Sequence, residues 1–254
     1  DVFNEKDNSL NSAIQIAEKF QHALQLLAGS YPDFNYWKVM VIEGKDSLSV
    51  AGGNQEIIVG ANRRPAPDKE LKGLFAHEAL VHALRWVNGS KKDERLSTGL
   101  PDYLDAEEGL GTYFEYCITG LVPEKNKDRY LDIAIALGLS GEMMQRSKLM
   151  SLVKNREIIR AQARSQTVDY DFINAKVSAH INRIYRGTSG DNIPGVFTKD
   201  IAYHEGFIKI ERFIQQKIEE NYTVAEIINF LLQGKFDPTN ELHINYLRGV
   251  NEAY

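Results

Sequence analysis

Apolar side chains recur at helical spacing near the start of the chain. Between residues 9 and 28, the positions that share this spacing are Ile14, Ala17, Phe20, Leu24 and Leu27. Apolar residues three or four positions apart lie on one side of an α-helix, and that side can pack against a core. Gly29 follows directly and is typical of a helix end. We therefore expect an amphipathic helix over residues 9–28.

Three short segments that follow are rich in aromatic and β-branched residues. They cover residues 36–42, 48–51 and 56–59, and Gly52-Gly53-Asn54 separates the last two. Such residues favour strands, and the glycines between them indicate a turn. The pattern predicts a small sheet of three or four strands in the N-terminal third of the chain.

Beyond Pro65 the pattern is mostly helical. The expected helices cover residues 69–86, 105–119, most of 128–185 with breaks near 138–141 and 167–171, 200–220 and 224–233, and a polar loop is expected over residues 90–104. Asp68 is a good N-cap for the first of these helices, and Thr223 with Glu226 forms a capping box for the last. The predicted fold class is α+β and mostly α-helical. The length suits one large domain or two intimately packed ones, and we expect a single domain over residues 1–254.

The composition is that of an ordinary globular protein. Of 254 residues, 43% are hydrophobic and 26% are charged. The net charge is -5 and no block rich in lysine or arginine occurs, so nothing indicates a nucleic-acid partner. No apolar run approaches the roughly 20 residues that a membrane span needs. We expect a protein that neither binds nucleic acid nor crosses a membrane.

Cys117 is the single cysteine, so an intramolecular disulfide is impossible. This favours a reducing compartment, and we expect a cytoplasmic protein. Because Cys117 lies in the apolar segment 113–118, we expect its thiol to be buried and inert.

The sharpest chemical signal is a pair of histidines and a glutamate inside a strongly apolar helical segment. These residues are His77, Glu78 and His82. Burying such groups is costly unless they are paired or coordinate an ion, and neutral imidazole is a preferred ligand of zinc. Glu78 would then face the open coordination position, take a proton from water and later deliver it to a leaving amine. In the alternative interpretation, both histidines are core residues of a helical protein without metal.

The spacing of the two histidines is unusual. The common zinc-peptidase pattern H-E-x-x-H places the histidines four residues apart on one helical face. Here they are five apart, which on a regular helix separates them by roughly 140°. Both can reach one metal only if the helix is locally widened. We therefore predict a π-type turn between His77 and His82.

A third ligand is expected from the next helix. Glu107 and Glu108 open that helix, and the small residues Gly109 and Gly111 allow close helix contact. We choose Glu108 as the ligand, and Glu107 is the alternative, which would otherwise orient a histidine. The remaining histidines, which are His22, His180, His204 and His243, are expected to be structural or exposed.

These motifs resemble a known family. The chain is similar to the microtubule-associated tyrosine carboxypeptidases and to their bacterial relatives, which are named for a Q-E-G-L-A motif. The elements that carry the resemblance are His77-Glu78-x-x-x-His82, Ala83-Leu84-Arg85, Asn88-Gly89, Glu107-Glu108-Gly109-Leu110, Tyr185-Arg186-Gly187 and Phe197-Thr198-Lys199-Asp200-Ile201-Ala202-Tyr203. They occur in the family's order.

The resemblance implies a zincin-like metallopeptidase with two histidines and a glutamate on Zn²⁺ and with Glu78 as the catalytic base. It also implies a carboxypeptidase that removes a C-terminal residue from a peptide or protein tail. The eukaryotic members of the family release tyrosine from α-tubulin.

A carboxypeptidase needs two further groups. A donor beside the metal must stabilise the oxyanion, and Tyr203 is the candidate, with a core tyrosine as the alternative. A cation must bind the terminal carboxylate of the substrate. Arg186 and Lys199 are the candidates because they lie in the family-like elements, and Arg183 and Arg85 are weaker ones. The strand near residues 56–59 is expected to pair with an extended substrate.

Other classes of function stay open. A zinc endopeptidase or amidase would use the same metal site on different bonds. A catalytically lapsed peptide-binding protein would keep the fold without the reaction. The presence of Glu78 argues against the lapsed protein.

Overall fold

The computed structural model describes residues 2–4, 6, 9–120, 127–139, 141–188, 191 and 195–252. The chain forms mostly helices and one small sheet, so the α+β class expected from the sequence is confirmed. It divides into two compact units: the first holds residues 1–122 and 205–254, and the second holds residues 123–204. The single catalytic domain stays a prediction. None of the described helices is long and apolar enough to cross a membrane.

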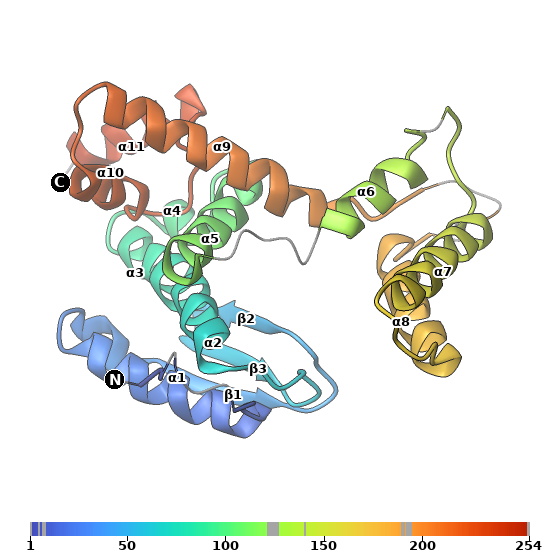
Figure 1. The fold of residues 1–254 in the computed structure, drawn as a ribbon. Coiled ribbons are helices and arrows are strands. Elements are labelled where there is room, and N and C mark those ends of the chain that lie inside the picture. Colours follow the sequence, from blue (N-terminus) through green and yellow to red (C-terminus); the bar gives the residue numbers. More distant parts are fainter. Residues whose placement is uncertain are drawn as a thin grey trace. The chain divides into compact units, whose positions relative to one another are not determined.

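The first unit contains the sheet and most of the helices (Figure 1). Its elements are α1 (Ala13–Ala28), the 3-10 helix η1 (Pro32–Tyr36), β1 (Lys38–Ile42), β2 (Leu48–Ala51), the 3-10 turn η2 (Gly52–Asn54), β3 (Glu56–Gly60), α2 (Asp68–Phe75), the π-helix η3 (Ala76–Ala83), α3 (Leu84–Ser90), α4 (Glu94–Thr98), α5 (Leu104–Thr119), α10 (Val224–Leu231) and α11 (Glu241–Glu252). The second unit contains α6 (Lys127–Ala136), α7 (Arg146–Ala163) and α8 (Tyr170–Ile184), and α9 (Lys199–Glu219) begins in it and continues into the first.

The three strands form a mixed sheet in the order β1-β3-β2. β1 runs parallel to β3, and β2 runs antiparallel to it, with Leu48 opposite Val59. The expectation that residues 56–59 pair with a substrate is therefore wrong, because β3 is the central strand and both of its edges are hydrogen-bonded within the sheet. The edges of this sheet are β1 and β2.

The sheet lies between α1 and the long helix formed by α2, η3 and α3 (Figure 1). α1 packs on β1 and β3, while η3 packs on β2 and β3. Phe20, Ile57 and Ala79, one from each layer, are fully buried in the same apolar cluster. The amphipathic pattern of the first helix and the β-branched strands thus produce one core. That core fixes η3 against the sheet.

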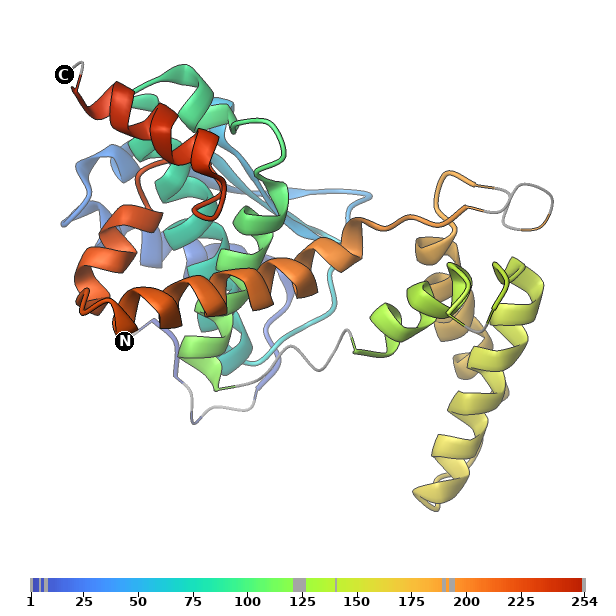
Figure 2. The ribbon, with the colours of Figure 1, turned by 90° about the horizontal axis from the view of Figure 1, so that it is seen from above.

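α5 and α9 cross at a pair of glycines, in the region where Figure 2 shows the green and orange helices overlapping. A Cβ atom on Gly206 would lie 1.9 Å from the carbonyl oxygen of Asp105, and one on Gly109 would lie 2.1 Å from the Gly206 backbone. No side chain fits at either position. The two glycines therefore allow the backbones of α5 and α9 to touch.

Several helix boundaries differ from the expected ones. Asp68 is not an N-cap: α2 begins at Asp68 itself, and its buried carboxylate binds Lys19 at 2.6 Å and Asn11 at 2.9 Å, which ties α2 to α1. The segment expected to be a polar loop contains α4, whose N-cap is Asp93. The final helix α11 was not expected at all. The capping box of Thr223 and Glu226 is confirmed.

A buried carboxylate connects the helices α6, α7 and α8 of the second unit, in addition to their apolar core. Asp132 on α6 is fully buried and accepts hydrogen bonds from both Nη atoms of Arg156 on α7, each at 2.7 Å. It also accepts one from His180 Nε2 on α8 at 2.7 Å. Burial alone would raise the pKa of Asp132, but the hydrogen bonds from His180 and Arg156 hold it below its ordinary value. One charged group thus connects all three helices.

Replacing this carboxylate gives a test of the second unit. Asp132→Asn keeps the shape but leaves Arg156 uncompensated, so the protein should lose about 3 kcal/mol of stability at pH 7. Because the folded pKa of Asp132 lies below the unfolded value, its contribution is present above pH 4 and disappears as the pH falls through the folded pKa. When the free energy of unfolding is measured with urea between pH 7 and pH 3, it should therefore fall less steeply with decreasing pH in the variant than in the unmodified protein. Asp171→Asn, an exposed control on α8, should change stability by less than about 0.5 kcal/mol. The same loss of unfolding free energy at low pH in Asp132→Asn and in the unmodified protein would contradict this role.

Candidate metal centre

The two histidines lie in a π-helical segment. η3 covers Ala76–Ala83 and continues α2 into α3 without a break. The wider turn brings the imidazole rings of His77 and His82 to 4.7 Å between ring centres. The π-type turn predicted from the five-residue spacing is therefore confirmed.

Glu108 on α5 faces both rings. Its Oε2 atom lies 3.5 Å from His77 Nε2 and 3.6 Å from His82 Nε2. One ligand atom from each of these three residues lies within 4.8 Å of the others, so the group could hold a metal ion. Two donors on a tetrahedral ion with bonds of about 2.1 Å are about 3.4 Å apart, which is close to the observed spacing. The side chains of His77, His82 and Glu108 are only 8%, 12% and 10% exposed, so they are largely shielded from solvent.

The other nitrogen of each ring is fixed by a carboxylate. His77 Nδ1 lies 2.8 Å from Glu115 Oε1, and His82 Nδ1 lies 2.8 Å from Glu107 Oε1. A carboxylate only accepts, so each Nδ1 carries the proton and donates it. Each Nε2 is then the nitrogen that faces Glu108, and it offers a lone pair to a metal once it is unprotonated. This arrangement, in which carboxylates hold the ligating histidines, is typical of metal sites.

Glu107 is in turn held by a buried arginine. Arg85 Nη1 donates to Glu107 Oε2 at 2.5 Å, and Lys235 Nζ lies 3.6 Å from Glu107 Oε1. Arg85 is 1% exposed and also donates to the carbonyl oxygens of Gly234 and Phe236. Burial would raise the pKa of Glu107, but Arg85 and His82 outweigh it and lower the pKa to about 2. Each guanidinium nitrogen of Arg85 thus donates to an acceptor of the protein, and the side chain is buried beneath Glu107 rather than exposed to solvent.

The site residues perturb one another's pKa values. Burial opposes a charge on His77, yet its hydrogen bonds to Glu108 and Glu115 raise the histidine pKa well above its ordinary value. The pKa of His82 is raised in the same sense by Glu107 and Glu108. Burial opposes ionisation of Glu108 too, but the two histidines lower its pKa far below the ordinary value. The neighbouring carboxylates thus favour the protonated form of both rings.

Glu78 stands out because one of its oxygen atoms lacks a partner. The side chain is buried, and Oε2 makes no hydrogen bond. Burial raises the pKa of Glu78, the two histidines oppose this shift, and Glu108 and Glu115 add to it. A buried carboxylate oxygen without a donor is uncommon and needs an explanation. A cation or a water molecule beside the histidines would supply one, so the residues present fit a bound metal.

Small residues allow α5 to approach the histidines. A Cβ atom on Gly111 would lie 2.6 Å from atoms of the His77 ring. Gly109, in contrast, faces Gly206 of α9 rather than η3. The close contact expected from these two glycines therefore exists, but Gly111 allows the approach of η3 and Gly109 allows the approach of α9.

Three sequence candidates lie in the second unit. Arg186 is exposed with its guanidinium 5.7 Å from the Phe197 ring centre, Lys199 is exposed at the start of α9, and Tyr203 is partly buried on the same helix. Their roles at the metal centre stay predictions. Arg183, the weaker candidate, donates two hydrogen bonds of 2.7 Å to Asp200.

The four other histidines are structural or exposed, as expected. His22 is exposed, His180 binds Asp132, and His204 stacks on Tyr130 at 4.9 Å between ring centres. His243 is buried and accepts a hydrogen bond from the Asp237 backbone.

One sequence-based expectation needs correction, and one residue of the site was missed. Cys117 is exposed and not buried, because the apolar residues around it on α5 lie near the surface and do not enclose it. Glu115 was not recognised as a site residue. It lies seven positions after Glu108, which is two helical turns and therefore the same face of α5, so this spacing could have indicated it.

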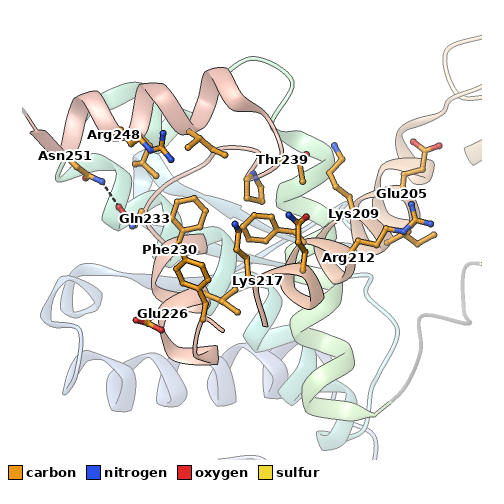
Figure 3. A pocket seen from close by; sticks show the side chains of 18 residues that line it. Glu205, Lys209, Arg212, Lys217, Glu226, Phe230, Gln233, Thr239, Arg248 and Asn251 are labelled. Atoms are coloured by element: carbon orange, nitrogen blue, oxygen red, sulfur yellow. Dashed lines mark hydrogen bonds between the residues drawn. The ribbon is translucent and has the colours of Figure 1, made fainter. Parts of the chain in front are cut away.

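A groove of about 1090 Å³ lies among α9, α10 and α11, and none of the candidate metal ligands lines it (Figure 3). Its floor is apolar, with Phe213 and Phe230 stacked at 6.0 Å between ring centres. The charged lining residues are Glu205, Lys209, Arg212, Lys217, Glu226 and Arg248. Lys209 pairs with Asp237 and Lys217 pairs with Glu220, and the others carry both signs. Charge therefore favours no single kind of occupant.

Glu115→Ala tests the support of His77. The variant removes the acceptor of the Nδ1 proton, so the ring is free to turn, and affinity for Zn²⁺ should fall by about 10–100-fold. Competition with a chromophoric chelator measures this affinity. Glu219→Ala, at an exposed position of α9, is the control and should bind like the unmodified protein. Unchanged affinity in Glu115→Ala would show that its hydrogen bond does not orient the ligand.

Comparison with known proteins places this geometry in a family. The family model described as "Microtubule-associated tyrosine carboxypeptidase" matches residues 2–134 and 171–251, which include all the residues of the metal centre. Among curated proteins, none matches the chain. The name describes a family of peptidases that act on the C-terminus of proteins. The chain belongs to the microtubule-associated tyrosine carboxypeptidase family.

Proposed function

We propose that the protein is a zinc-dependent carboxypeptidase that removes the C-terminal residue of a peptide or protein tail. His77, His82 and Glu108 hold the metal, and Glu78 is the general base. The observation that carries this proposal is the convergence of His77 Nε2, His82 Nε2 and Glu108 Oε2, with both Nδ1 atoms fixed by carboxylates. Two imidazoles and one carboxylate form a ligand set of catalytic zinc sites.

In this reaction the metal and Glu78 have separate roles. Zinc, when bound, polarises the scissile carbonyl and lowers the pKa of water toward neutrality. Glu78 accepts the proton of the attacking water and then delivers it to the leaving amine. A raised pKa suits this double role, because a strongly acidic carboxyl would accept a proton poorly. Burial of Glu78 also keeps bulk water from competing for that proton.

β2 is positioned to align the substrate. It is an edge strand, and it packs against η3, which carries both histidines. An extended peptide that pairs with an edge strand gains main-chain hydrogen bonds independently of its sequence. We assign this role to β2 in place of the central strand β3.

The family supports tyrosine as the released residue and a protein tail as the substrate. Tyr203 is the proposed donor to the oxyanion, and Arg186 and Lys199 remain candidates for contacts with the substrate. A single cysteine suits the cytoplasm, where such a tail would be found.

Metal content is the first test. The purified protein should carry about one zinc per chain by elemental analysis, and His82→Ala should lose it, because a two-ligand site binds zinc weakly. His22→Ala, an exposed histidine on α1, is the matched control and should keep the metal. No zinc in the unmodified protein, even after zinc is added, would contradict the metal site and favour core histidines.

Glu78→Gln tests the base. The variant should keep its zinc while the rate of peptide hydrolysis falls by about 10²–10⁴-fold. Hexapeptides ending in tyrosine, with either a free or an amidated C-terminus, serve as substrates, and mass spectrometry identifies the products. If tyrosine is released from the peptide with a free C-terminus and not from the amidated peptide, the result supports a carboxypeptidase. Internal cleavage of both forms would indicate an endopeptidase, and binding without cleavage in the unmodified protein would indicate a lapsed enzyme.

A further inference from the structure

Arg63 lies in the connection between β3 and α2, next to the helix that carries the histidines. Its side chain is 13% exposed, so the guanidinium is largely removed from water. Its backbone is fixed by a hydrogen bond from Arg63 N to the Gly60 carbonyl. A long cationic side chain in this position needs a partner, because a buried charge without one is strongly unfavourable.

The hydrogen-bonding capacity of Arg63 is not used. Its Nε atom is buried and has no partner, and Nη2 lies 4.0 Å from Glu70 Oε1, which is too far for a hydrogen bond. Glu70 instead accepts from Arg64 at 2.5 Å. The carboxylate nearest to Arg63 is thus already engaged by its neighbour.

Two other arginines with a buried, unpaired Nε show the contrast. Arg156 binds Asp132 through Nη1 at 2.7 Å, and Arg129 approaches Asp200 through Nη1 at 3.3 Å. Each has a carboxylate of the protein within reach of its Nη atoms. Among the arginines with this feature in the described part of the chain, Arg63 is the one whose ion pair, with Glu70 at 4.0 Å, is too long for a hydrogen bond.

The surroundings of Arg63 connect it to the catalytic centre. Burial lowers the pKa of its guanidinium, and Glu70, Glu78 and Glu115 oppose this shift, while Arg64 adds to it. The carboxylates that act on Arg63 thus include the proposed base and the residue that holds His77. The side chain remains charged at neutral pH. Its ion-pair partner Glu70 lies seven residues before His77 on the continuous helix of α2 and η3, which is two turns along the same face, so Arg63 lies on the side of the helix that carries His77.

We propose that Arg63 binds the terminal carboxylate of the substrate and so restricts the enzyme to C-terminal residues. This inference rests on the proposed function and identifies the group that sets its specificity. A planar guanidinium matches a carboxylate through two parallel hydrogen bonds, and a substrate terminus supplies the partner that the protein does not. Arg63 takes this role in place of the Arg186 and Lys199 candidates.

Peptide binding to a protein that cannot cleave separates this role from catalysis. In the zinc-loaded Glu78→Gln variant, fluorescein-labelled hexapeptides ending in tyrosine are compared with the same peptides carrying a C-terminal amide. The free form should bind about 10–100-fold more tightly, which is the strength of a charged hydrogen-bond pair. Adding Arg63→Ala should remove this preference and leave the weak binding of the amide unchanged. Adding Arg63→Lys should restore part of it.

Arg212→Ala is the control. Arg212 is an exposed arginine on α9, so its loss should leave the preference intact. Unchanged zinc content and amide binding in each variant show that it is folded. A preference that persists in Arg63→Ala, or equal or undetectable binding of both peptides before Arg63 is changed, overturns the proposal.

The same variants distinguish failure of this inference from failure of the proposed function. If the protein with Glu78 intact releases tyrosine but Arg63→Ala keeps its ratio of kcat/KM between free and amidated peptides, the carboxypeptidase stands and the role of Arg63 is refuted. If no peptide is cleaved but binding of the free terminus depends on Arg63, the proposed reaction fails and the role of Arg63 stands.

Discussion

The π-helical turn of η3 is the constraint on which the metal centre depends. Histidines five residues apart point in different directions on a regular helix, so His77 and His82 meet only because the turn between them is wider. A π-turn is less favourable than an α-turn, and the segment is held in place by burial on both sides. Ala79 and Ala83 are fully buried against the sheet, and Val81 is fully buried in the cluster that contains Leu110 of α5. Packing therefore enforces the backbone geometry that the chemistry needs.

Contacts behind the histidines explain why Glu108, and not Glu107, faces both Nε2 atoms. Glu107 and Glu108 are one residue apart, so on a helix they face directions about 100° apart. Arg85 binds the first and also holds the carbonyl oxygens of Gly234 and Phe236, which links the segment after α10 to the centre. With Glu107 fixed on His82, Glu108 is the carboxylate directed at both Nε2 atoms. Residues nearly 150 positions apart in the chain thus determine which side chain can bind the ion.

Local signals predicted much of this fold. The helical and strand periods placed α1, the three strands and α5 within a few residues, and the histidine spacing alone predicted the π-turn. Long-range contacts were beyond such signals. Nothing in the local pattern indicates that β3 is central, that Arg85 reaches Phe236 or that Arg63 Nε lacks a hydrogen-bond acceptor, because each depends on segments that meet only after folding. Glu115 lies between these two cases. The sequence could have shown that it shares a helical face with Glu108, but not that it contacts His77.

The charges around the centre explain why these features occur together. Glu78, Glu107, Glu108 and Glu115 are carboxylates, while the described cations that act on them are Arg85, Lys235 and Arg63. Arg85 and Lys235 compensate Glu107, which leaves the carboxylates nearest the histidines in excess. The raised pKa values of both histidines reflect this excess, because protonated rings relieve it. A divalent ion held by these residues would relieve it more completely. The terminal carboxylate of a peptide is the anion that we propose Arg63 orients.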